Sequence, residues 1–336
     1  MSSAPTADEI VRDATWLAQA LDPGAGMVRF VAMDSDSYRA ASFLDDRLMQ
    51  SPVDARILGW PEVEAAMSGE LRTDARWIFH IGHVGSTLVA RLLGEIEDVL
   101  AIREPRLLRD VALSPPEVRQ PYLAPIPKLM SRTFGESEFA CVKATSFASE
   151  IAQDLVPPGE RSLFMYATPR HYVASILAGE NSVKELHALA HYRSERLARR
   201  GIALPPARND ADRAAAAWAC EMSTLQAVSE EMADRHIAWA DFDAMLGEME
   251  SELGRVAGFF DFRADEEQLS SISSGPLMRR YSKDPKHEYS SRLRAELIAQ
   301  ELRLQGRDIE AALAMLRTAA EKSELLSSAL ARAEGN

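Results

Sequence analysis

The chain has 336 residues, of which 46% are hydrophobic and 26% charged, a mixture typical of a globular protein with a sizeable core. At about 150 residues per domain, this length predicts two domains, or one large domain with extensions. The 38 lysines and arginines stand against 51 aspartates and glutamates, so the net charge is −13. Such an acidic chain is unsuited to coating nucleic acid or anionic membranes non-specifically.

The two cysteines, Cys141 and Cys220, are accompanied by no CxxC motif or Cys/His cluster. That pattern disfavours structural zinc and a disulfide framework, and it predicts two buried thiols in a reducing compartment. The N-terminal residues are acidic rather than basic and then apolar, and no apolar run approaches the roughly 20 residues that span a bilayer. We therefore expect a cytoplasmic protein with neither a nucleic acid nor a membrane as partner.

Residues 1–75 are predicted to form a helical N-terminal extension, with a helix over 7–20 and a short strand over 28–32. From residue 76 onward, short apolar runs alternate with helical stretches, which predicts strands over 77–81, 99–102, 139–144, 162–167 and 236–240. An amphipathic helix over 86–97 follows the first strand. Another follows the last and carries Met245, Met249, Leu253 and Val256 on one face. This alternation predicts a three-layer α/β sandwich with a central parallel sheet.

Helical blocks over 183–200 and 211–233 interrupt the alternation, and Asn209 or Asp210 is suited to cap the second. A helical tail follows over 290–333, with a break at Gly306. Its apolar stripe is expected to pack on the body of the protein, although it is also compatible with a homodimer; the stripe is Ile309, Leu313, Leu316 and Ala320. The predicted organisation is an extension over 1–75, an α/β domain over 76–290 with a helical insert or lid over 183–235, and a tail over 291–336.

The segment from His80 to Leu88 lies between a predicted strand and a predicted helix, where a loop can present successive N–H groups to a phosphate. Gly82 and Gly85 allow a tight turn there, and hydroxyl groups follow at the helix N-terminus. The pattern GxxxxGK(S/T) fails, because Ser86 stands at its lysine position and His80 at its first glycine. The missing lysine disfavours ordinary ATP or GTP hydrolysis. A plain strand-to-helix turn is the alternative interpretation.

Five short motifs follow one another at the ends of the predicted strands. They are HVGSTL over 83–88, Glu104 in REP, Lys143 in VKAT, ATPRHYVAS over 167–175 and WADF over 239–242. In this order they resemble the motifs of the sulfotransferases that use 3′-phosphoadenosine 5′-phosphosulfate (PAPS). The resemblance is strongest to the branch with the tyrosylprotein and carbohydrate enzymes. It covers roughly residues 76–290; each motif is weakly specific alone, and their order strengthens the match.

The resemblance implies a P-loop NTPase-like fold and a metal-free transfer from PAPS that leaves 3′-phosphoadenosine 5′-phosphate (PAP). It makes Glu104 the general base for the acceptor hydroxyl, and Lys143 the cation that neutralises the bridging oxygen as the sulfuryl group leaves. His83 binds the phosphosulfate or replaces Glu104 as the base. The other donor-binding residues are Gly82, Val84, Gly85, Ser86, Thr87 and Leu88 of the loop, Arg170 and Ser175 for the 3′-phosphate, and the late basic residues Arg279, Arg280 and Lys283.

Simpler interpretations of the same residues stay open. Glu104 is also compatible with a structural role as an acidic residue in the first turn of a helix. Lys143 is also compatible with a lysine at a strand end whose side chain reaches solvent. A lysine inside the otherwise apolar run 139–144 nevertheless favours a function, because lysine is rarely buried without a partner. The basic stretch 279–283 also suits a surface loop.

The chain departs from the family pattern at three places. His83 stands for the basic residue of the loop and can be neutral at pH 7. Ala167 stands for the arginine that opens the 3′-phosphate motif, and the family's R-K-G signature is absent from the late basic stretch. Arg170 or residues 279–283 are the expected replacements for the missing cation.

Two other functions remain to be weighed against sulfuryl transfer to a small-molecule or glycan acceptor whose pocket is roofed by residues 183–209. A P-loop kinase that uses ATP–Mg²⁺ is disfavoured, because the chain lacks the Walker lysine and an Asp-rich magnesium motif. A non-catalytic nucleotide-binding protein fits the losses at His83 and Ala167, but it has no need of Glu104 and Lys143.

Overall fold

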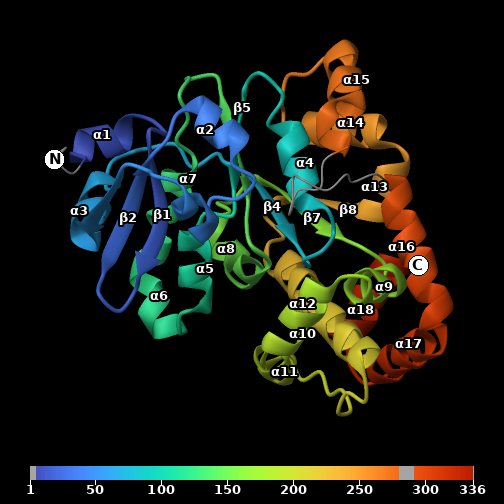
Figure 1. Ribbon diagram of the computed structural model, residues 1–336. Helices are drawn as coiled ribbons and strands as arrows, with labels where there is room; N and C mark the ends of the chain where they lie inside the picture. Colours follow the sequence, from blue (N-terminus) through green and yellow to red (C-terminus); the bar gives the residue numbers. More distant parts are fainter. Residues whose placement is uncertain (1–4, 280–290, 336) are drawn as a thin grey trace.

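The computed structural model describes residues 5–279 and 291–335 (Figure 1). Its larger sheet has five strands in the order β5-β6-β4-β7-β8, and every neighbouring pair is parallel. In that order the strands are Val99–Arg103, Phe139–Lys143, Arg76–His80, Arg161–Tyr166 and His236–Asp241. Each lies within one residue of its predicted bounds, so the predicted parallel sheet is confirmed.

Helices cover both faces of this sheet (Figure 1). One face carries α4 (Ser86–Leu93) and α14 (Met249–Phe259), and the other carries η2 (Ser146–Ile151), α9 (Pro169–Leu177) and α12 (Asp210–Glu231). The central strand β4 is buried along its whole length, with an apolar run of Trp77, Ile78 and Phe79, because neither face of the sheet meets water. The predicted three-layer α/β sandwich is therefore confirmed.

Residues 5–75 form a second sheet rather than a mainly helical extension. Its antiparallel order is β1-β2-β3, with bounds Trp16–Asp22, Met27–Ala32 and Ala55–Gly59. The strand predicted over 28–32 is confirmed, but the helix predicted over 7–20 is wrong, since α1 covers only Ala7–Arg12. Residues 16–21 are all buried, with α5 (Arg106–Leu113) packed against them, and a short buried apolar run does not distinguish strand from helix. The other elements are α2 (Ser35–Ala40), η1 (Asp46–Gln50) and α3 (Trp60–Ala66).

The predicted helical stretches differ from the observed helices mainly where they are divided. The block over 183–200 is two helices, α10 (Glu180–Ala188) and α11 (Ala190–Arg199), and Asn209 caps α12 through the N–H of Asp212. The helix expected to carry residues 245–256 is also two, because Glu248 leaves helical geometry between α13 (Phe242–Gly247) and α14. The remaining helices of this part are α6 (Pro116–Leu123), α7 (Ile126–Met130), α8 (Ala152–Leu155), α15 (Glu266–Ser274) and η3 (Pro276–Arg279).

The tail comprises α16 (Ser291–Leu304), α17 (Gly306–Ala320) and α18 (Glu324–Glu334), so the break predicted at Gly306 is confirmed. In the predicted stripe, Ile309, Leu313 and Leu316 are buried in the main core and Ala320 is half-buried. Helices α17 and α18 pack against α12. The stripe therefore packs on the body of the protein, as expected.

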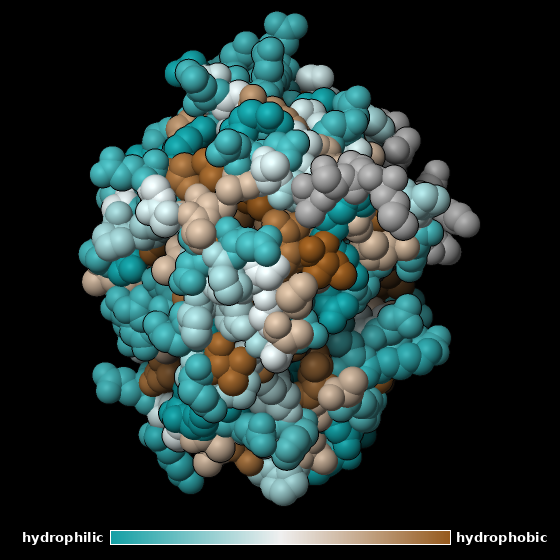
Figure 2. Space-filling model, turned by 90° about the vertical axis from the view of Figure 1, so that its left-hand side faces the viewer, coloured by the Kyte–Doolittle hydropathy of each residue, from teal (hydrophilic) through white to brown (hydrophobic). Residues whose placement is uncertain are grey.

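Both cysteines are buried and free, as predicted, and burial raises the pKa of each thiol to about 12. Among the described residues, no helix combines the length and the apolar character needed to cross a membrane. Figure 2 shows the side of the molecule on which the N-terminal sheet lies, where hydrophobic residues form small patches among hydrophilic ones.

Candidate active site

The candidate site lies at the carboxyl ends of the central strands. Strand β4 lies between β6 and β7, and the chain leaves it toward β5 on one side before it reaches β7 on the other. The crevice beyond such a point of reversal is where open α/β sheets bind ligands. The loop after β4 reaches this point, and Arg103 pairs with Lys143 across β5 and β6. The sheet thus brings the loop, Glu104 and Lys143 to one edge.

The loop between β4 and α4 has the backbone geometry of an anion cradle at its first turn. Gly82, His83 and Gly85 have φ values of 80°, 55° and 62°, in the left-handed region that bends successive N–H groups inward. A Cβ atom added to Gly82 would meet nothing within 4 Å, so the space there is open. No side chain among the described residues caps α4, which leaves the N–H groups of Ser86 and Thr87 at its N-terminus for an anion.

Gly85 is required for a different reason. A Cβ atom at this position would fall within 2.4 Å of three ring atoms of Phe242. The phenyl ring therefore packs directly on the loop backbone, and only glycine fits. Phe242 begins α13 immediately after β8, so the WADF motif contacts the loop at its second glycine.

His80 supports the loop rather than the chemistry. It is 5% exposed; its Nδ1 accepts a hydrogen bond from the N–H of Gly82 at 2.9 Å, and its Nε2 lies 3.0 Å from the carbonyl oxygen of Ala144. A neutral imidazole with its proton on Nε2 satisfies both contacts. His80 thus ties the start of the loop to the residue after Lys143.

The imidazole of His83 is held by α10. Its Nδ1 lies 3.3 Å from Ser182 Oγ and its Nε2 lies 3.6 Å from a carboxylate oxygen of Glu185. The side chain is 9% exposed. These contacts join the loop to the helices of the predicted lid, and the catalytic role of His83 stays a prediction.

Glu104 and Lys143 form a direct ion pair. The Lys143 side chain is 2% exposed and that of Glu104 is 18% exposed. The Glu104 N–H donates to the Lys143 carbonyl oxygen at 2.8 Å, and Glu104 has φ 52°, a conformation that costs a non-glycine residue about 1–3 kcal/mol. The lysine within the apolar strand is therefore buried with a partner, and the left-handed backbone of Glu104 is compatible with both its hydrogen bond and its ion pair to Lys143.

Arg103, immediately before Glu104, connects the site to the N-terminal sheet. Its guanidinium donates to the carbonyl oxygens of Tyr38 and Ala41, with Nε 2.9 Å from the latter, and its own carbonyl oxygen accepts from the N–H of Leu44 at 2.7 Å. Burial lowers the pKa of Arg103 to about 10. The sequence offers no indication of this connection, because Arg103 looks like part of the motif around Glu104.

The segment bonded to Arg103, residues 38–47, also contacts Lys143 of the ion pair. The Lys143 ammonium lies 5.8 Å from the ring centre of Phe43, and the guanidinium carbon of Arg47 lies 3.3 Å from the same ring centre. Phe43 is 7% exposed. Residues 38–47 of the N-terminal part therefore lie beside Lys143 and are hydrogen-bonded to Arg103, the residue before Glu104.

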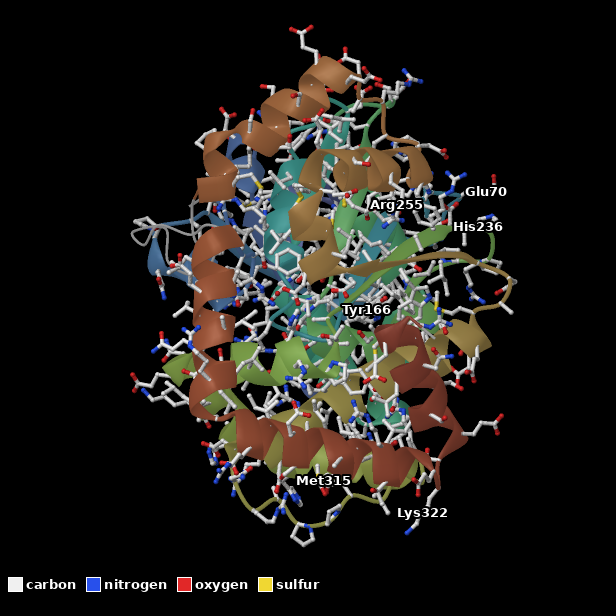
Figure 3. The ribbon with its side chains drawn as sticks, turned by 90° about the vertical axis from the view of Figure 1, so that its right-hand side faces the viewer. Glu70, Tyr166, His236, Arg255, Met315 and Lys322 are labelled. Carbon is white, nitrogen blue, oxygen red and sulfur yellow. The ribbon has the colours of Figure 1, made fainter. Side chains whose placement is uncertain are left out.

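The residues expected to bind the 3′-phosphate lie on α9, and the C-terminal tail reaches both of them. Arg170 is exposed and forms an ion pair with Glu310 of α17, and Ser175 Oγ accepts a hydrogen bond from Arg294 Nη1 of α16 at 3.1 Å. Figure 3 views the molecule from this side, with α16 and α17 in the foreground; Met315 marks α17 and Lys322 the turn after it. Glu310 and Arg294 are not predictable from the sequence, because the surrounding tail carries no motif that identifies them.

Ala167 is a core position. Its side chain is fully buried and its carbonyl oxygen accepts a hydrogen bond from the indole N–H of Trp218 at 2.9 Å. An arginine here would have to enter the core beneath α12. Of the late basic residues, Arg280 and Lys283 lie outside the described residues, and Arg279 ends η3.

The helices of the predicted lid are anchored by buried charge. Arg196 of α11 is fully buried, and its Nη1 donates to both carboxylate oxygens of Glu221 on α12 at 3.0 Å. Arg196 Nε and Arg200 Nη2 donate to Glu150 of η2, the latter at 2.9 Å. Since Arg193 adds another bond to Glu221 at 3.1 Å, α11 is fixed to α12 and η2. Assignment of 183–235 to a lid stays a prediction.

A surface hollow of about 520 Å³ lies elsewhere, between the C-terminal end of α4 and α15. Its lining includes the carboxylates of Glu95, Asp265 and Glu267. Such a lining repels a phosphate, so the loop after β4 is the better anion site.

Comparison with known proteins gives solved structures but no sequence relatives: no family model and no curated protein matches the chain. The chain is similar to the sulfotransferase domain from the curacin biosynthetic pathway, at 11% identity and a TM-score of 0.42, over 70% of this chain and 99% of that one. It is similar to the sulfotransferase domain from the Synechococcus PCC 7002 olefin synthase, at 12% identity and a TM-score of 0.38, over 67% and 93%. Mouse sulfotransferase SULT7A1, complexed with PAP, matches at 10% identity and a TM-score of 0.32, over 76% and 92%.

All three are sulfotransferases. The parallel strand order and the position of the loop after the central strand support the P-loop NTPase-like fold expected from the motifs.

Proposed function

We propose that the protein transfers a sulfuryl group from PAPS to a hydroxyl or amine of a small-molecule or glycan acceptor. The observation that carries this proposal is the contact between Glu104 and Lys143 at the strand ends beside the loop. A carboxylate and an ammonium at that edge supply the base and the cation that an in-line displacement requires. A protein that only binds a nucleotide needs neither.

The donor lies with its phosphosulfate on the loop. The open space at Gly82 and the uncapped N–H groups of Ser86 and Thr87 accommodate the anion. Val84 and Leu88 are buried and fix the loop and the first turn of α4 beneath it. The lysine that a Walker loop carries is absent, and Lys143 supplies the cation from the neighbouring strand instead.

Glu104 and Lys143 divide the chemistry. Glu104 takes the proton from the acceptor hydroxyl as the acceptor oxygen forms its bond to sulfur. The bond between sulfur and the bridging phosphate oxygen breaks, its electron pair stays on that oxygen, and Lys143 balances the developing charge. We assign the acceptor side of the site to residues 38–47, because Phe43 lies beside Lys143 and Leu44 is hydrogen-bonded to Arg103, the residue before Glu104.

The test is incubation of the protein with sulfur-labelled PAPS and a panel of hydroxyl and amine acceptors in EDTA, with PAP release as the readout. Transfer that persists in EDTA and is lost in Glu104→Gln supports the proposal. A matched control is Glu95→Gln, which removes a carboxylate at the far end of α4. Transfer of the γ-phosphate from ATP that requires Mg²⁺ would instead identify a kinase.

A further inference from the structure

Arg294 of α16 lies in a polar cluster with Ser175 of α9 and Asp243 of α13. Its Nη1 donates to Ser175 Oγ at 3.1 Å and its Nε donates to Asp243 Oδ1 at 3.0 Å. Three elements that are far apart in the sequence thus meet at one guanidinium. The contact between α16 and α9 is part of a broader packing of the tail on this helix.

The Arg294 guanidinium has one nitrogen left over. Its Nη2 is buried and has no hydrogen-bond partner among the described residues, and the side chain as a whole is 12% exposed. A buried charged donor without an acceptor is unfavourable, so it is usually found where a further ligand supplies the acceptor. For a cation with two N–H groups on that nitrogen, the matching acceptor is an anion with more than one oxygen.

The guanidinium is separated from the loop by a single side chain. Its central carbon lies 5.2 Å from the ring centre of Phe242, and that ring packs directly against Gly85. Phe242 therefore fixes the spacing between the loop, which suits one anion, and Arg294, which suits a second. A nucleotide with phosphates on two different ribose oxygens has this bipartite charge.

The cluster also contains acidic side chains that share its basic ones. The Asp243 carboxylate is shared, because His171 Nδ1 lies 3.1 Å from its other oxygen. Burial works to raise the pKa of Asp243, but the hydrogen bond from His171 and the charge of Arg294 outweigh it and lower that pKa. The carboxylate of Asp241 also acts on His171 and Asp243, so two carboxylates share the cluster with Arg294 and His171. The exposed Arg170 lies on α9 with His171.

We propose that Arg294, together with Ser175, binds the 3′-phosphate of the nucleotide and replaces the arginine that position 167 cannot hold. Ala167 is core, so the cation comes from the tail rather than from the strand end. This inference rests on the proposed function. It makes the tail part of the donor site and makes Arg294 a residue that distinguishes PAP from 5′-AMP, which lacks the 3′-phosphate.

The test is calorimetric titration of the full-length protein with PAP and with 5′-AMP, for the wild type and for Arg294→Gln. We expect the substitution to weaken PAP binding about 10- to 100-fold, the effect of losing a charge-assisted hydrogen bond, and to change 5′-AMP binding less than about 3-fold. Arg303→Gln is the matched control, since Arg303 is exposed on the last turn of the same helix. If Arg294→Gln does not fold, Ser175→Ala is expected to reduce the same discrimination about 3- to 10-fold.

The outcomes separate the two proposals. If neither PAP nor 5′-AMP binds the wild type, the proposed function is overturned. If PAP binds the wild type more tightly than 5′-AMP and Arg294→Gln keeps that preference, the inference about Arg294 is overturned and the proposed function stands. Equal binding of the two nucleotides to the wild type, or an equal loss of PAP binding in Arg303→Gln, also overturns the inference.

Discussion

The candidate site has a half made of strand ends and a half made of helices, and the two are built differently. In the strand-end half, one parallel sheet positions Glu104, Lys143 and the loop after β4. In the helix half, Arg170 and Ser175 of α9 receive their partners from Glu310 and Arg294, which lie 140 and 119 residues later in the chain. The first half depends on backbone pairing, and the second on how a distant tail packs.

This difference determines whether sequence motifs can predict which residues lie together. Residues that end neighbouring parallel strands must lie together, so their motifs predict one site. Residues on a helix surface have neighbours that the local sequence does not determine. Where the family pattern has an arginine at a strand end, this chain has a core alanine and an arginine on α16. The following predictions test how far the two halves are independent.

The largest expected effect on stability is in the helices that border the site. Arg196→Met leaves Glu150 and Glu221 without their shared buried cation, so we expect the free energy of unfolding to fall by about 3–5 kcal/mol. Urea denaturation measures it. Arg199→Met, an exposed position on the same helix, is the control and is expected to change stability by less than about 0.5 kcal/mol. Equal losses in both variants would refute the anchoring role of Arg196.

The largest expected effect on activity is in the strand-end half. Lys143→Met removes the cation at the bridging oxygen, so we expect the rate of sulfuryl transfer to fall about 10²- to 10³-fold. The exposed Lys322→Met is the control and is expected to keep the wild-type rate. A near-normal kcat in a Lys143→Met variant that unfolds like the wild type would show that Lys143 does not take part in the transfer.

The buried ion pairs between Glu150 of η2 and the arginines of α11 predict an acid transition. Burial works to raise the pKa of Glu150, but the hydrogen bond from Arg200 and the charge of Arg196 lower it from 4.5 to about 2. The resulting stabilisation is fully present above about pH 5 and is lost as the pH falls toward 2, with a total of about 2–3 kcal/mol. The difference in unfolding free energy between wild type and Glu150→Gln should therefore be constant from pH 7 to 5.5 and shrink below pH 4.5. A difference that does not depend on pH would contradict this assignment.

The smallest expected effect concerns the exposed ion pair between Arg170 and Glu310. Because both side chains are about half exposed, Glu310→Gln should lower stability by no more than about 1 kcal/mol. If Arg170 also serves the nucleotide, the same change should tighten PAP binding about 2- to 5-fold, since Glu310 no longer competes with the phosphate. Glu324→Gln, on α18, is the control. Unchanged PAP binding in Glu310→Gln would show that Arg170 pairs with the tail and does not bind the nucleotide.

Much of the fold followed from the sequence because apolar periodicity and strand-end motifs are local. All five parallel strands, the cap at Asn209 and the break at Gly306 were predictable in this way. The strand at Trp16–Asp22 was not, because α5 buries it and a buried run lacks the alternation typical of strands. The division of helices at Glu248, in contrast, directly follows Gly247, and a glycine inside a helical pattern is a local signal that weakens the helix.

The candidate site, like the fold, was predictable where it depends on sheet topology. The proximity of Glu104, Lys143 and the loop follows from sheet topology, and the structure brings them together. Other contacts of the site join segments that share no motif. They are the hydrogen bonds of Arg103 to Tyr38 and Ala41 and the hydrogen bond of Arg294 to Ser175. A single sequence shows the chemistry of such residues but not their partners.

The most direct test of sulfuryl transfer as the function is thermal denaturation with PAP in EDTA, beside ADP and ATP–Mg²⁺. The account predicts that PAP at 100 times its dissociation constant stabilises the protein by about 2.7 kcal/mol, and that ADP and ATP–Mg²⁺ at the same concentration stabilise it less. Stabilisation by ATP–Mg²⁺ in preference to PAP, or by none of the three, would contradict it.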